Sequence, residues 1–67
     1  MTKAKRAVAH AFDAHIAAKL RRAREMQGFT QTRLAAAVGV SFQQIQKYEA
    51  GEVRVSAGRL MQLCKVL

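Results

Sequence analysis

Apolar side chains recur at helical spacing along most of the chain, and proline is absent. In the first such stretch they lie three or four positions apart, which is the spacing of one face of an α-helix. These residues are Phe12, Ile16, Leu20 and Ala23. The stretch predicts a helix over roughly Ala14–Gln27. Asp13 is its expected N-cap, and Gly28 supplies the permissive residue that ends it.

Two short helices are predicted next, joined by the turn Gly39-Val40-Ser41. Thr30 is the expected N-cap of the first helix, and Gly39 ends it because glycine tolerates the left-handed conformation that closes a helix. Ser41 and Gln44 have the spacing of a capping box and open the second of the two helices. Gly51 is expected to end that helix.

A fourth helix is predicted after the connector Glu52–Val55, with Ser56 as its N-cap. Its apolar residues follow the i, i+3, i+4, i+7 pattern and are Leu60, Leu63, Cys64 and Leu67. Cys64 is interpreted as a small buried hydrophobic residue. The chain stops at Leu67, on the apolar stripe, which is typical of a domain that has been cut. The whole pattern predicts an all-α fold, a compact bundle of four short helices.

The two short helices alone would also fit an ordinary αα-hairpin, so the outer face of the second one is informative. Ile45, Tyr48 and Glu49 share its inner side at 100° per residue. The outer side presents Gln43 and Lys47, flanked by Gln44 and Gln46. A solvated helix usually mixes acidic and basic side chains, whereas this face has amides, one cation and no acid. Glutamine can bind adenine and lysine can donate to guanine, so the face indicates contact with DNA.

The charge of the chain also indicates a polyanionic partner. The 67 residues carry a formal net charge of +8, and the sequence pI is about 11.0. Residues 1–24 hold seven Lys or Arg and one Asp, a net of +6, whereas residues 25–67 hold five Lys or Arg and three Glu, a net of +2. We therefore expect a flexible basic arm over residues 1–12 and one DNA-binding domain over residues 13–67.

Length and composition argue against several classes of protein. A chain this short has no room for a deep cleft, and it has no Ser-His-Asp grouping, glycine-rich phosphate loop or paired carboxylates. We therefore expect no enzymatic activity, no cofactor and no small-molecule ligand. His10 and His15 lack the further ligands of a metal site. A single cysteine and the lack of a long apolar run predict a cytoplasmic, nucleoid-associated protein without a membrane partner.

These residues resemble the lambda-repressor-like helix-turn-helix family of transcriptional regulators (the Cro, phage-repressor and xenobiotic-response-element type). The shared string covers roughly residues 13–67 and consists of Thr30-Gln31, Leu34-Ala35, Val38-Gly39-Val40-Ser41, Ile45, Tyr48-Glu49 and Gly51. The resemblance implies a sequence-specific regulator, a repressor, that reads the major groove of double-stranded DNA with residues 42–49. It also implies a homodimer on a two-fold operator. The family commonly has a fifth helix, and this chain ends before one.

Together with the outer-face pattern, the resemblance implies roles for single residues. Base contacts are expected from Phe42, Gln43, Gln46 and Lys47, and phosphate contacts from Gln31, Ser41 and Arg54. Gln31 would be helped by the N-terminus of its helix. Phe42 could touch a thymine methyl group or cover Ile45. Arg24 and Glu49 match a structural ion pair between the first and third helices, and the helical wheel places both at the border of the core.

Three other functions compete with this interpretation. A DNA-binding antitoxin of a toxin–antitoxin pair uses the same fold. A protein-interaction module of the bridging-coactivator type would need an apolar patch on the third helix, where this chain has polar side chains. A basic amphipathic helix at a membrane surface, over residues 1–24, would need tryptophan or a leucine-rich face.

Overall fold

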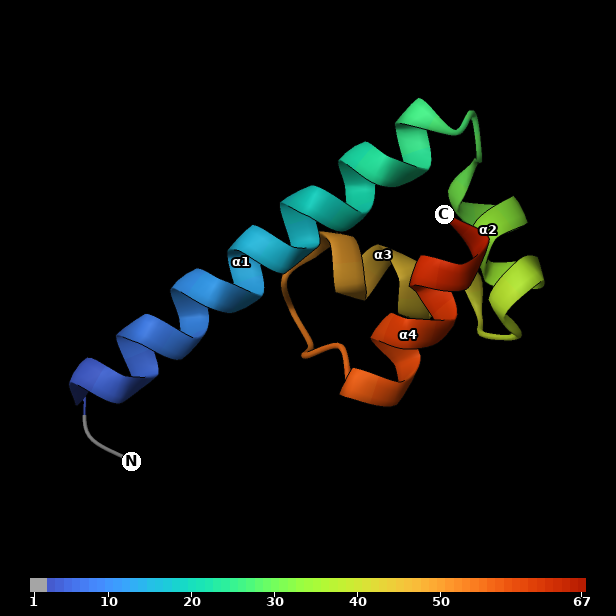
Figure 1. The fold of residues 1–67 in the computed structure, drawn as a ribbon. Coiled ribbons are helices and arrows are strands. Elements are labelled where there is room, and N and C mark those ends of the chain that lie inside the picture. The colour runs from blue at the N-terminus through green and yellow to red at the C-terminus, as the bar shows by residue number, and fades with distance from the viewer. Residues whose placement is uncertain (1–2) are drawn as a thin grey trace.

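The boundaries of the last three helices follow from hydroxyl caps in the sequence. The computed structural model describes the backbone of residues 3–67 and the side chains from Asp13 onward. Its helices are α1 (Lys3–Met26), α2 (Gln31–Val38), α3 (Phe42–Ala50) and α4 (Ala57–Val66) (Figure 1). The hydroxyls of Thr30, Ser41 and Ser56 each accept a hydrogen bond from the backbone N–H three residues further on. All three predicted N-caps are therefore confirmed.

Glycines end α2 and α3 where the sequence predicts it. Gly39 has φ 81° and Gly51 has φ 73°, in the left-handed region that glycine enters without a steric penalty. The N–H of Gly39 donates to the carbonyl of Ala35 at 2.9 Å, and the N–H of Val40 donates to the same oxygen at 3.0 Å. The chain therefore turns sharply from α2 into α3 with the Ala35 carbonyl paired twice.

Helix α1 begins at Lys3, so the predicted start at Ala14 is wrong. Alanine, lysine and arginine have high helix propensity and dominate residues 3–11, so the helix continues although this stretch has no apolar stripe. Ten of the twelve residues assigned to the flexible arm are therefore helical, and residues 1–2 lie outside the described part. Asp13 is not an N-cap, because it lies inside the helix. Within residues 3–67, no helix is both long and apolar enough to cross a membrane.

The core takes one large aliphatic side chain from each helix. Leu34, Ile45 and Leu63 are fully buried, and Leu20 is nearly so. Tyr48 completes the cluster between α3 and its neighbours. Helix α3 packs against α1 and α2, and α4 packs against α2. The N-terminal part of α1 extends past the other three helices (Figure 1), so the core lies beside its C-terminal half.

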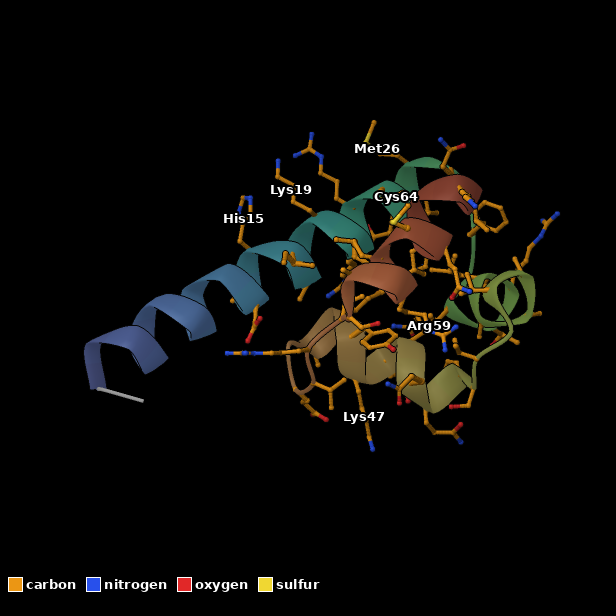
Figure 2. The ribbon with its side chains drawn as sticks, turned by 60° about the horizontal axis from the view of Figure 1, so that its bottom comes forward. His15, Lys19, Met26, Lys47, Arg59 and Cys64 are labelled. Carbon is orange, nitrogen blue, oxygen red and sulfur yellow. The ribbon has the colours of Figure 1, made fainter. Side chains whose placement is uncertain are left out.

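Helix α4 leaves part of its apolar stripe uncovered. An apolar hollow of about 390 Å³ separates it from α1, and its walls include Ile16, Leu20, Leu60 and Leu63. Cys64 also lines the hollow and is exposed, so its predicted burial is wrong. It lies 100° around the helix from Leu63, which takes the buried position. Figure 2 shows Cys64 on the same side of the molecule as Lys19 and Met26.

Candidate nucleic-acid interface

Helix α3 has one buried and one exposed side, as its sequence predicts. Ile45 is fully buried and Tyr48 is 6% exposed. Phe42 is 38% exposed, and Gln43, Gln46 and Lys47 are exposed as well. Figure 2 shows Lys47 pointing away from the body of the protein. The four side chains expected to contact bases are therefore accessible on one short helix.

A hollow of about 470 Å³ lies between the exposed side of α3 and the neighbouring helices. Its lining includes Gln31 from α2 and Gln43, Gln46 and Lys47 from α3. The structure thus brings together four of the residues predicted from the sequence. They offer amide donors and acceptors and one ammonium group, which suits both base edges and phosphates.

Arg21 of α1 lines the same hollow, although it is not among the site residues predicted from the sequence. Its side chain is 66% exposed and donates to Glu25 at 2.8 Å. Arg21 lies one helical turn before Arg24, which pairs with α3. That spacing was the available signal, because residues three apart share a helix face.

The predicted partners Arg24 and Glu49 are in contact beneath this surface. Arg24 Nε donates to Glu49 Oε2 at 2.7 Å, and Arg24 Nη2 donates to Oε1 at 3.0 Å. The two side chains are 11% and 3% exposed. The hydrogen bond to Glu49 raises the pKa of Arg24, against the opposing effect of burial. Arg24 Nη1 also donates to the carbonyl of Phe29 at 2.8 Å, so one guanidinium ties α1 to α3 and to the loop before α2.

Gln31 is the first residue of α2, at the helix terminus where backbone N–H groups point outward. Its side chain is half-buried, and Nε2 donates to Glu49 Oε1 at 3.2 Å. The Gln31 amide therefore lies between the buried ion pair and the hollow that Gln43 and Lys47 share with it.

The other three predicted site residues lie outside this hollow. Ser41 and Phe42 are at the first turn of α3, and the Ser41 hydroxyl accepts from the N–H of Gln44 at 3.1 Å. Arg54 lies beyond the opposite end of α3, where Nε donates to the Asp13 carboxylate at 3.1 Å. Its side chain is still 62% exposed. No local pattern in the sequence predicts the contact with Asp13, which lies 41 residues away.

A family profile described as helix-turn-helix matches residues 20–67, most of the chain. The chain belongs to the helix-turn-helix family. The resemblance drawn from its sequence is thus confirmed, and so is the all-α, lambda-repressor-like fold class. The turn of this helix-turn-helix is Gly39-Val40-Ser41, and α2 and α3 are its two helices.

Several curated relatives share the helix-turn-helix segment. Two HTH-type transcriptional regulators of Sinorhizobium fredii are similar: one is 53% identical over 58 residues, covering 87% of this chain and 41% of the relative. The other is 48% identical over 63 residues, covering 94% and 44%. A Rhodospirillum rubrum protein described as a transcriptional regulator in the ATPase CF(0) region is 48% identical over 58 residues, covering 87% and 54%. The chain spans about half the length of these relatives. No solved structure matches it.

Proposed function

We propose that this domain binds double-stranded DNA sequence-specifically and acts as a transcriptional regulator. The observation that carries the proposal is the chemistry of one surface: the exposed side of α3 has amides and a lysine, and Gln31 and Arg21 border it. Of the two carboxylates that line the same hollow, Glu49 is buried in its ion pair and Glu52 lies beyond the end of α3. An α-helix with its side chains is about 10 to 12 Å across, so α3 fits into a major groove about 12 Å wide. The names of the curated relatives favour the same function.

In this arrangement α3 lies in the major groove, where Gln43, Gln46 and Lys47 face base edges. Gln43 and Lys47 are one turn apart, so they reach neighbouring base pairs. Phe42, 38% exposed at the start of the helix, contacts a thymine methyl group. Gln31, Ser41 and Arg54 contact phosphates on both sides of the groove, and so does Arg21. Arg54 either breaks its hydrogen bond to Asp13 and contacts a phosphate directly, or keeps that bond and reaches the DNA backbone through a water molecule.

We further propose that two copies bind one operator and repress transcription by occupying it. One helix of this length reads only a few base pairs, and each good pair of hydrogen bonds contributes about 1 to 3 kcal/mol of discrimination. A two-fold pair of domains doubles the sequence that is read, with half-sites about 34 Å apart on one face of the duplex.

The test is selection of binding sites from random duplexes with the chain. We expect enrichment of a two-fold sequence whose halves are one helical turn apart, and sedimentation of two protein chains per selected duplex. The matched control is Gln43→Glu, which keeps the size of the side chain and adds a negative charge facing the DNA. It should enrich nothing. Equal enrichment by the wild-type chain and by the Gln43→Glu variant would contradict the proposal. Enrichment of a single half-site would contradict the dimer alone.

A further inference from the structure

One buried carboxylate lies where three helices meet. Glu49 of α3 is 3% exposed and accepts hydrogen bonds from Arg24 of α1 and from Gln31 of α2. The bond from Arg24 involves both carboxylate oxygens and is enough to pair the charge. The bond from Gln31, at 3.2 Å to Oε1, is therefore not needed to neutralise Glu49.

The bond from Gln31 has a consequence on the surface. An ionised carboxylate can only accept hydrogen bonds, so the amide nitrogen of Gln31 must face Glu49 and the amide oxygen must face away. The amide nitrogen carries two hydrogens, and Glu49 takes one of them. The second remains to donate to a group outside the protein. Glutamine otherwise loses much rotamer freedom when it is ordered, so an amide that is held in advance binds with less entropic cost.

We propose that Glu49 is a positioning residue for DNA binding, which orients the Gln31 amide toward a phosphate before the duplex arrives. This inference rests on the proposed function. The ion pair inside the fold thereby also sets the geometry of one contact at the interface. Lys47 and Gln43 share the hollow with Gln31, so an ordered amide also limits where the duplex can lie against α3.

The first test is a double-mutant cycle in DNA affinity, measured on the selected duplex below the melting temperature of every variant. Glu49→Gln should weaken binding about tenfold when Gln31 is present, the loss expected for a hydrogen bond to a charged group. In the Gln31→Ala background the same substitution should weaken binding less than about twofold, because its effect passes through Gln31. If the two losses multiply, Glu49 acts through the fold alone and the proposal is overturned.

Gln46→Ala provides the matched control for this cycle. Gln46 is an exposed glutamine that lines the same hollow, and its side chain has no hydrogen bond to Glu49 among the described contacts. The fold-losses of DNA affinity caused by Gln46→Ala and by Glu49→Gln should multiply in the double variant. Coupling as strong as that of Gln31 would overturn the specific route through the Gln31 amide.

The second test uses the free protein and needs no variant. Relaxation of side-chain amide nitrogens by NMR should show the Gln31 amide more ordered than the Gln46 amide. Equal mobility of the two amides would overturn the positioning role even if the chain binds DNA. Failure of the wild-type chain to bind any duplex would instead overturn the proposed function. If the Gln31 amide is ordered in that chain, the positioning geometry is present, and it is the proposed function that has failed.

Discussion

Two of the contacts that join helix α1 to the rest of the protein are very different in kind. At the Glu49 junction, formed by Arg24, Gln31, Glu49 and the Phe29 carbonyl, directional hydrogen bonds of 2.7 to 3.2 Å fix each group. At the α1–α4 hollow, apolar side chains face a space of about 390 Å³. Hydrogen bonds set angles, whereas apolar contacts mainly require exclusion of water. The junction therefore fixes the geometry of the surface that we propose contacts DNA, whereas the apolar contacts at the hollow constrain orientation less.

The largest effect should come from breaking the junction. Glu49→Gln removes the charge that pairs with Arg24 and leaves a guanidinium that is 11% exposed. We expect a loss on the order of 3 kcal/mol in the free energy of unfolding, measured by urea denaturation. Glu25→Gln is the control, because Glu25 is 54% exposed and pairs with Arg21 at the surface. Its loss should stay within about 0.5 kcal/mol, and equal losses would show that burial of the pair is irrelevant.

A slightly smaller effect should come from the apolar contact. Leu63→Ala empties a fully buried position on α4 and should cost about 2 kcal/mol, the lower end for such truncations because the open hollow lets neighbours relax. Cys64→Ala, one residue further on, removes an exposed side chain and should change stability by less than about 0.5 kcal/mol. Thermal melting of both variants measures the difference. A larger loss for Cys64→Ala would contradict its exposed position.

Replacement by alanine should have opposite effects on stability at two glycines, Gly39 at the turn from α2 into α3 and Gly58 on α4. Gly39 has φ 81°, so Gly39→Ala should destabilise by about 1 kcal/mol, although no atom within 4 Å would contact the new Cβ. Gly58 lies in the first turn of α4, also with open space around it. Gly58→Ala should stabilise by about 0.5 kcal/mol, because alanine has less freedom to lose. Loss of stability in both variants, seen by urea denaturation, would contradict the open space at Gly58.

The salt dependence of DNA binding separates the charged surface from both internal contacts. If each protomer neutralises about 3 to 5 phosphates, the slope of log K against log salt should be roughly −3 to −5 per protomer. Arg21→Gln should make that slope shallower by about 1, because it removes one phosphate contact. Glu25→Gln, which frees Arg21 from its surface partner, should not make the slope shallower. A flat response of the wild-type chain would contradict phosphate contacts altogether.

Local signals predicted most of the fold. Thr30, Ser41 and Ser56 cap their helices as expected, because the hydrogen bonds that define a cap lie within three residues of each other. The start of α1 could not be predicted from an apolar stripe, since residues 3–11 form a helix through their propensity. The exposure of Cys64 depends on how closely α4 approaches α1, which periodicity does not determine.

The candidate site was predictable to a similar extent. Gln43 and Lys47 are readable from the helical wheel, because one helix places both on the same side. The pairing of Arg24 with Glu49 needed the family resemblance as well. The bond between Gln31 and Glu49, and that between Arg54 and Asp13, join segments 18 and 41 residues apart, so they depend on how the helices cross.

The central claim is that α3 reads the bases, and one comparison of two glutamines tests it most directly. The binding-site selection is repeated with Gln43→Ala and with Gln31→Ala, after melting curves show both variants near the wild type. Gln43→Ala should cost about 1 to 3 kcal/mol on the best site and relax the preference at one or two base pairs. Gln31→Ala should weaken binding to all sequences alike and leave the selected site unchanged. If Gln43→Ala keeps both the affinity and the selected sequence, α3 does not read the bases and the account is wrong.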